Sequence, residues 1–544
     1  MSGVLHGWPG IIAAYAAVQA PMIAGLVRAQ AKFHQYVISP AVAVPLMAVA
    51  VVATAVSDPL LLQLGFAAHG TAQMAVATGI SAVLGFAGGH AIAHGAPQDR
   101  LHQRGSLVAE RSAAVQTDHA SADAGITLAG VRIPAQDETK HFKLIGATGT
   151  GKSTAIEEIM ASALARGDRA VIADPDGGYL RRFYRKDRGD LILNPFDERS
   201  VKWDLFAEIR STYDVEQLAR SLIPDHEGQD RSWRGYARTF FSAVTRQAHE
   251  AGIADIGELY RLLVVADNDE LRGLLRGTPA QPFLDEHNSR MFDSIRSVTS
   301  SAVAALDYIA QQKKTNFSVR DWINEDKPGV LFIPYKAGQI AALRSTISGW
   351  MRLAIFETMD HGEDKSRLWF VVDELDALGQ IDGLKDALAR LRKFNGRCVL
   401  GFQSIAQVST TYGQGDAHTI IENCGNTLIL RCSASEGGGT ARFASQLIGE
   451  REVLRTTTSR SLRMTEMLGS VSRSQHFSIE SAVLPSEVEQ LPDLTGYLKY
   501  ASEPTWQRVR LDARNKWAEL RSGQVRTAQA GKERSQRFVD ASRE

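Results

Sequence analysis

The sequence predicts an α/β domain with a largely parallel sheet, an all-α domain inserted into it, and a transmembrane helical hairpin before both. Three observations predict this arrangement. Two long uncharged segments lie near the N-terminus, short apolar runs alternate with helical patterns after residue 126, and a stretch of roughly a hundred residues has helical periodicity throughout. At 544 residues the chain exceeds one compact core, so two or three domains are expected.

The composition excludes little. Acidic and basic residues balance at 61 each, so any surface that binds nucleic acid has to be local. The three cysteines, Cys398, Cys424 and Cys432, lack the spacing of metal ligands. An odd number of cysteines favours reduced thiols in the cytosol over a disulfide framework.

The two uncharged segments are predicted to cross a membrane as a hairpin. Residues 37–57 and 70–92 each exceed the roughly 18 residues that span about 30 Å of hydrocarbon, and His90 is their one titratable side chain. The connecting residues 58–69 contain no Lys or Arg. Basic residues flank the outer ends: Arg28, Lys32, Arg100 and Arg104. The positive-inside rule therefore predicts that both ends of the hairpin lie in the cytoplasm.

A further uncharged segment, residues 8–27, is interrupted by Pro9, Gln19 and Pro21. It is expected either to lie in the membrane interface or to form a third span, and its lack of a clear charge asymmetry favours the interface. A cleaved signal peptide fits poorly, because no basic region precedes the apolar stretch. Gly85 and Gly89, four residues apart, would permit close helix approach and self-association, although chance produces such pairs often in Gly- and Ala-rich segments.

After residue 126 the apolar runs read as strands between helices, which predicts a parallel sheet covered on both faces. The strand candidates are residues 140–145, 170–173, 190–193, 329–334, 368–372, 398–402 and 427–431. Residues 208–319 break the alternation with helical periodicity alone, exemplified by Phe240, Phe241 and Val244, and predict the all-α insertion.

The stretch Gly146-Ala-Thr-Gly-Thr-Gly-Lys-Ser153 follows the first strand candidate and precedes a helical pattern. A strand, this glycine loop and a helix together wrap the phosphates of a nucleotide. Lys152 would lie between the β- and γ-phosphates, Ser153 would bind Mg²⁺, and the helix N-terminus would face the same charge. The predicted binding residues are Gly146, Thr148, Gly149, Thr150, Gly151, Lys152, Ser153 and Thr154.

The second half of such a site follows the strand candidate 368–372. Asp373 would bind Mg²⁺, and Glu374 would orient and polarise the attacking water, a role worth roughly 10²–10⁴-fold. Asp373 alone could be a strand-end cap, but its pairing with the phosphate loop favours the site. Gln403, after the next strand, is expected to sense the γ-phosphate, with capping of the following helix as the alternative.

A basic cluster precedes that strand: Arg390, Arg392, Lys393 and Arg397. An arginine reaching the nucleotide of a neighbouring subunit would stabilise charge in the transition state. A solvated helix face explains the cluster equally well, and periodicity leaves both interpretations open.

Several motifs together resemble the coupling proteins of bacterial conjugation, the TraD/TrwB type of the type IV secretion systems. They are Gly146–Ser153, Ala173-Asp-Pro-Asp-Gly177, Leu193-Asn-Pro-Phe-Asp197, Val372-Asp-Glu-Leu375, Gly401-Phe-Gln-Ser404 and Leu491-Pro-Asp-Leu494. The resemblance implies a RecA-like P-loop domain and a multi-pass ATPase of the bacterial inner membrane, with most of the chain cytoplasmic. It further implies six-membered rings that bring a relaxase–DNA complex to the secretion channel and pump single-stranded DNA with ATP and Mg²⁺.

By position, Lys152 and Ser153 match the phosphate loop of this family, and Asp373 and Glu374 match its acidic pair. Gln403 matches the sensor, and Arg392 matches the arginine proposed to act between subunits. One departure is that the connection at residues 58–69 is too short for a large periplasmic domain.

The implied domains are residues 1–36 (interfacial or additional membrane segment), 37–95 (transmembrane hairpin), 96–125 (linker), 126–207 and 321–522 (nucleotide-binding domain), 208–320 (all-α domain) and 523–544 (flexible tail). Residues 455–474, rich in Ser, Thr and Arg, are expected to form a disordered loop. That loop and the tail are candidates for a DNA or relaxosome surface. The alternative functions are a double-stranded DNA translocase of the chromosome-segregation kind and a nucleotide-gated membrane scaffold that does not hydrolyse ATP.

Overall fold

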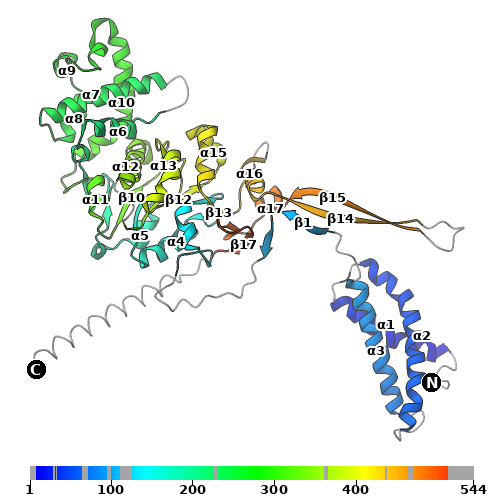
Figure 1. The fold of residues 1–544 in the computed structure, drawn as a ribbon. Helices are drawn as coiled ribbons and strands as arrows, with labels where there is room; N and C mark the ends of the chain where they lie inside the picture. Colours follow the sequence, from blue (N-terminus) through cyan, green and yellow to red (C-terminus); the bar gives the residue numbers. More distant parts are fainter. Residues whose placement is uncertain are drawn as a thin grey trace, which may run out of the picture. The chain divides into compact units, whose positions relative to one another are not determined.

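The computed structural model describes residues 8–28, 31, 33–63, 71–94, 100–110, 125–225, 231–360, 366–434, 438–461 and 470–512. The expected flexible tail, residues 523–544, and most of the expected linker lie outside these ranges. The chain divides into two units, each described by itself: residues 1–104 with 452–479, and residues 105–451 with 480–544 (Figure 1).

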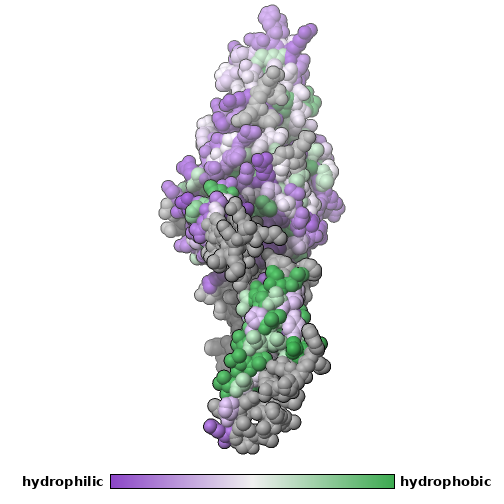
Figure 2. Space-filling model, turned by 90° about the vertical axis from the view of Figure 1, so that its right-hand side faces the viewer, coloured by the Kyte–Doolittle hydropathy of each residue, from purple (hydrophilic) through white to green (hydrophobic). Residues whose placement is uncertain are grey.

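The first unit contains three apolar helices: α1 (Trp8–Arg28), α2 (Phe33–Gln63) and α3 (Thr71–His94). Each contains a window long and apolar enough to cross a membrane: Ile11–Arg28, Gln35–Val56 and Ala75–Ile92. Hydrophobic residues dominate their visible surface, whereas the surface of the larger unit in the same view is mostly hydrophilic (Figure 2). The structure thus has three candidate spans where the sequence analysis favours two.

Helix α1 packs closely along α3, and glycines make the contact possible. A Cβ on Gly85 would approach the carbonyl oxygen of Val18 to 2.2 Å, and one on Gly89 would approach that of Met22 to 2.1 Å. From the other side, a Cβ on Gly25 would lie 2.5 Å from the oxygen of Phe86. The glycine pair therefore serves contact within the chain, and the interpretation as a self-association face is wrong.

The larger unit is built on a mixed sheet of ten strands in the order β2-β17-β16-β13-β5-β12-β11-β6-β10-β7. The strands from β13 to β7 pair in parallel, and β16 is antiparallel to both of its neighbours. Their bounds are Val108–Glu110 (β2), Phe142–Ile145 (β5), Arg169–Pro175 (β6), Leu191–Ile192 (β7), Val330–Tyr335 (β10), Leu368–Val372 (β11), Gly396–Phe402 (β12), Asn426–Ile429 (β13), Thr495–Lys499 (β16) and Trp506–Arg510 (β17). The seven predicted strands and the largely parallel sheet are confirmed.

Helices cover both faces of this sheet, as the strand periodicity requires. Along β6, Ala170 and Ile172 join a core formed with α4 (Lys152–Ala165) and α5 (Gly178–Phe183). The alternate residues Val171 and Ala173 join a second core on the other face, to which helix α12 (Ile340–Asp360) contributes. Successive residues of a strand point to opposite faces of the sheet, so both faces of each strand are buried.

Helices alone occupy the chain between Thr212 and Ala310, apart from turns and residues 226–230 outside the described ranges. They are α6 (Thr212–Leu222), α7 (Arg231–Glu250), α8 (Ile256–Val264), α9 (Asn268–Leu274) and α10 (Ser289–Ala310), grouped at one side of the larger unit (Figure 1). Phe240 and Phe292 meet edge-to-face, with ring centroids 5.2 Å apart, in the core between α7 and α10. These helices therefore pack against one another in a core that is continuous with one face of the sheet.

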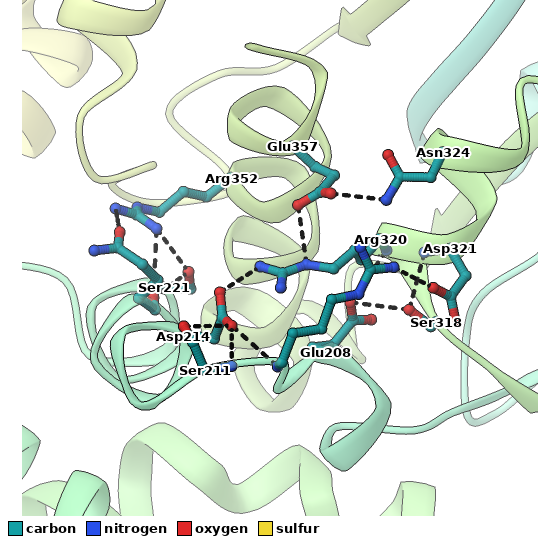
Figure 3. Close-up of polar contacts among 12 residues, drawn as sticks. Glu208, Ser211, Asp214, Ser221, Ser318, Arg320, Asp321, Asn324, Arg352 and Glu357 are labelled. Atoms are coloured by element: carbon teal, nitrogen blue, oxygen red, sulfur yellow. Dashed lines mark hydrogen bonds and ion pairs between the residues drawn. The ribbon is translucent and has the colours of Figure 1, made fainter. Parts of the chain in front are cut away.

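A buried polar network joins helix α6 to α11 and α12, near the points where the chain enters and leaves the helical segment (Figure 3). Arg320, in α11 (Val319–Glu325), pairs with Asp214 of α6 at 2.7 Å and with Glu357 of α12 at 2.9 Å. Glu208 accepts hydrogen bonds from the backbone N–H groups of Val319 and Arg320, at 2.7 and 3.1 Å. These contacts hold α6 and α11 against α12.

Residues 455–474 were expected to form a disordered loop, but both ends of this segment belong to a long β-ribbon. Strands β14 (Glu450–Ser461) and β15 (Ser470–Ser481) form a three-stranded sheet with β1 (Arg100–Gly105). Residues 462–469 between them lie outside the described ranges. Pairing with β1, more than three hundred residues earlier in the chain, supplies backbone partners that local sequence does not reveal.

Candidate nucleotide-binding site

The phosphate loop links β5 to α4, with the backbone folded in a way that requires glycine. Gly149 and Gly151 have φ of +77° and +118°. A Cβ on Gly151 would lie 2.8 Å from the side chain of Leu494, and one on Gly146 would lie 2.8 Å from Thr150 Oγ1. The loop is thus tightly folded and has no room for side chains at Gly146 and Gly151, as a phosphate-binding loop requires.

Lys152, the first residue of α4, is buried with its ammonium inside this cradle. Its Nζ donates to the carbonyl oxygens of Gly146 and Ala147, at 2.6 and 3.1 Å. Burial lowers its pKa, and the nearby Asp373 and Glu374 oppose that shift. A cation held by a glycine loop at a helix N-terminus fits the phosphates of a nucleotide.

Ser153 and Asp373 meet beside Lys152. Ser153 Oγ donates to Asp373 Oδ2 at 2.7 Å, although the two residues are 220 positions apart. Hydroxyl and carboxylate oxygens suit Mg²⁺, which also uses water and nucleotide oxygens as ligands. Among the described residues no group of three or more His, Cys, Asp or Glu could hold a metal by itself. These two residues therefore fit a Mg²⁺ ion that the nucleotide helps to hold.

Gln403 joins the acidic pair to the phosphate loop. Strand β12 lies between β5 and β11, so the residue after it sits between the loop and Glu374. Gln403 Nε2 donates to Glu374 Oε1, and Thr148 Oγ1 donates to Gln403 Oε1 at 2.9 Å. The side chain thus faces the site, as the sensor hypothesis requires.

Glu374 is half-buried beside Asp373. Burial, and secondarily the charge of Asp373, raises its pKa, which makes its carboxylate a stronger base than one in water. Thr154, in the first turn of α4, and Thr150, whose hydroxyl donates to Ala147 O at 2.8 Å, complete the predicted loop residues.

Arg392 is not brought to this site within the chain. It lies exposed after α13 (Leu384–Leu391), just before β12, whereas the phosphate loop follows the opposite end of the parallel strand β5. Arg390 and Lys393 are also exposed. Arg397 differs, because it is buried, pairs with Glu138 at 3.2 Å and stacks over Trp369. It therefore has a structural role and does not belong to the exposed basic cluster.

Sequence reasoning missed Tyr179. Its hydroxyl donates to Asp373 Oδ2 at 2.7 Å, and its ring is buried. It lies two residues after the motif Ala173–Gly177, and nothing in its local sequence marks it as a site residue.

A Gly-x-x-x-x-Gly-Lys-Ser loop between a strand and a helix defines the P-loop nucleotide-binding proteins, and this chain has that loop between β5 and α4. The family model described as "Type IV secretion-system coupling protein DNA-binding domain" matches residues 125–512. The chain belongs to this family of coupling proteins.

Named relatives and solved structures agree with the family. Coupling protein TraD of Escherichia coli (strain K12) is 32% identical over 383 residues, which cover 69% of this chain and 53% of TraD. Conjugal transfer protein TraG of Escherichia coli is 23% identical and covers 65% of this chain and 62% of its own length. This chain thus spans about half to two thirds of these relatives.

The fold is that of solved TrwB structures. The conjugative coupling protein TrwBdeltaN70, in an unbound monoclinic form, is 33% identical with a TM-score of 0.65, covering 72% of this chain and 89% of that chain. TrwB in complex with the non-hydrolysable ATP analogue ADPNP is 31% identical with a TM-score of 0.66, covering 76% and 95%. TrwB has also been solved with ADP and Mg²⁺, at 33% identity and a TM-score of 0.64, covering 72% and 89%.

Proposed function

We propose that this protein is a membrane-anchored ATPase of the bacterial inner membrane that links a relaxase–DNA complex to a type IV secretion channel and pumps single-stranded DNA. The main observation in support of hydrolysis is the series of hydrogen bonds from Thr148 through Gln403 to Glu374. These bonds join the phosphate loop to the proposed general base. The complexes of TrwB with ADPNP and with ADP and Mg²⁺ support ATP and Mg²⁺ as the ligands here.

In this mechanism Lys152 and the loop N–H groups hold the phosphates, and Ser153 and Asp373 hold Mg²⁺. When bound there, Mg²⁺ would supply positive charge to offset the negative charge developing on the phosphates. Glu374 orients and polarises the attacking water, and Gln403 aligns that water or reports the loss of the γ-phosphate to the loop through Thr148.

ATP hydrolysis is the activity that distinguishes this motor from a nucleotide-gated scaffold. Lys152→Ala is expected to abolish ATP turnover while binding of a fluorescent oligonucleotide, followed by anisotropy, survives. The exposed Lys186→Ala is the matched control and should retain both activities. A scaffold would instead bind DNA and partners without measurable turnover in the unmodified protein.

The packing of α1 supports a third membrane span. Charges then alternate across the bilayer. Arg28 ends α1, Lys32 precedes α2, and Arg100 and Arg104 follow α3, whereas residues 1–7 and 64–70 have no Lys or Arg. Three spans place residues 1–7 outside the cytoplasm and the nucleotide site inside it. Both ends of the hairpin formed by α2 and α3 stay cytoplasmic in this topology, and only the start of α1 lies on the other side.

Cysteine labelling tests this topology. The native cysteines are all buried, so an introduced cysteine is the accessible one. In intact cells, Ser2→Cys should react with a membrane-impermeant maleimide, whereas the exposed Gln103→Cys should react only after lysis. If both positions react only after lysis, residue 2 lies in the cytoplasm and α1 does not cross the membrane.

The position of Arg392 supports action between subunits of a ring, for which we propose six members. Arg392→Ala subunits keep an intact phosphate loop, and Lys152→Ala subunits keep the arginine. Mixed in one ring, the two should hydrolyse ATP faster than either alone, because some interfaces combine both intact halves. If mixing recovers no activity, Arg392 does not act on a neighbouring nucleotide.

A further inference from the structure

The motif Ala173-Asp-Pro-Asp-Gly177 has no part in the site described so far, yet it ends the strand beside Asp373. Strands β6 and β11 pair in register, with Val372 opposite Ala173. After β6 the chain turns through Asp176 and Gly177, whose φ values are +58° and +66°. The turn leads directly into α5, whose N-cap is Gly177.

Asp174 fixes where that helix begins. Its carboxylate is fully buried and accepts the backbone N–H groups of Tyr179 at 3.1 Å and Leu180 at 2.7 Å. Burial raises the pKa of Asp174 to about 6, and these hydrogen bonds oppose the shift. The motif thereby sets the position of one side chain, Tyr179, relative to the neighbouring strand.

Tyr179 reaches across to the acidic pair. Its ring is 3% exposed, and its hydroxyl donates to Asp373 Oδ2 at 2.7 Å. Ser153 Oγ donates to the same oxygen at the same distance. A tyrosine phenol is protonated at neutral pH, so this hydroxyl is a donor to the carboxylate.

The two donors have different fates in the proposed function, on which this inference rests. Ser153 would bind the metal through its hydroxyl oxygen and can still donate its proton to Asp373, so its position depends on the ion. Tyr179 is not a ligand, and its hydroxyl restrains the Asp373 carboxylate with or without the metal. Partners that orient a ligating carboxylate typically contribute 10–100-fold to metal affinity.

We propose that Tyr179 is a positioning residue for Mg²⁺: its hydroxyl holds the Asp373 carboxylate in the orientation that the metal requires. The motif Ala173–Gly177 serves to place that hydroxyl. Tyr179 takes no part in bond breaking.

Nucleotide binding with and without Mg²⁺ tests this role in the full chain. A fluorescent ADPNP analogue is titrated in EDTA and at increasing Mg²⁺. Tyr179→Phe should leave binding in EDTA unchanged and raise the Mg²⁺ concentration needed for tight binding about 10–100-fold. ATP turnover should recover at high Mg²⁺, because the chemical groups are intact.

Tyr335→Phe is the matched control. Tyr335 is 5% exposed at the end of β10 and close to the same carboxylates, but among the described contacts its hydroxyl makes no bond with Asp373. It should behave like the unmodified protein. An unchanged Mg²⁺ requirement in Tyr179→Phe, or an equal shift in both variants, would overturn the role of Tyr179. Absence of Mg²⁺-dependent binding in the unmodified protein would overturn the proposed function and this role with it.

Discussion

Replacing Glu374 with glutamine is expected to slow ATP turnover by about 10²–10⁴-fold while ATP still binds. Glutamine keeps the size of the side chain and its position beside Gln403, but it cannot accept a proton from water. The phosphate loop and Asp373 are untouched, so the contacts that hold the nucleotide remain.

The measurement pairs steady-state turnover with equilibrium binding of a fluorescent ATP analogue. Glu422→Gln, an exposed change on α15 (Gln414–Asn423), controls for the loss of one negative charge. Turnover near that of the unmodified protein in Glu374→Gln would remove Glu374 from the role of general base.

A single methyl group at Gly401 is expected to disable the site without changing any of its functional groups. A Cβ there would lie 1.9 Å from the backbone oxygen of Asp373, far inside contact distance, and backbone is all that could move. Gly401 also accepts the N–H of Leu375 at 3.1 Å. Gly401→Ala should therefore push β11 away from β12 and displace both acidic residues.

The expected cost to folding stability is about 1–3 kcal/mol or more, as for other overpacked cores. Thermal unfolding gives the stability, and Mg²⁺-dependent nucleotide binding reports the position of Asp373. Gly415→Ala is the matched control, because a Cβ at that helix position meets no atom within 4 Å. A folded Gly401→Ala protein with normal turnover would show that the spacing of β11 and β12 does not matter.

The nucleotide-binding site could be predicted from local sequence because each part of the site is a short motif at the end of a strand. The glycines at 146, 149 and 151 and the apolar run before Asp373 have physical meaning within a few residues. The strands beside them, β5 and β11, are confirmed together with the five other predicted strands. The roles of Glu374, Gln403 and Arg392 stay predictions, since geometry alone does not test chemistry.

Features that depend on distant partners were predicted poorly. The ribbon of β14 and β15 lacks apolar alternation, and its partner β1 lies at the other end of the chain. Helix α1 contains Pro21, which a membrane helix tolerates when neighbours pack around it, and its neighbour α3 is recognisable only in three dimensions. Tyr179 is recognisable as a site residue only in the folded protein, where its hydroxyl donates to Asp373 Oδ2 after the adjacent strand.

The central claim is that hydrolysis at this site is coupled to DNA. It is tested most directly by the ATP turnover of the full chain in lipid nanodiscs without DNA, with single-stranded DNA and with double-stranded DNA of the same length. Turnover should rise with DNA, most with the single strand; greater stimulation by the double strand would favour the alternative translocase. Equal turnover in all three conditions would contradict a DNA motor.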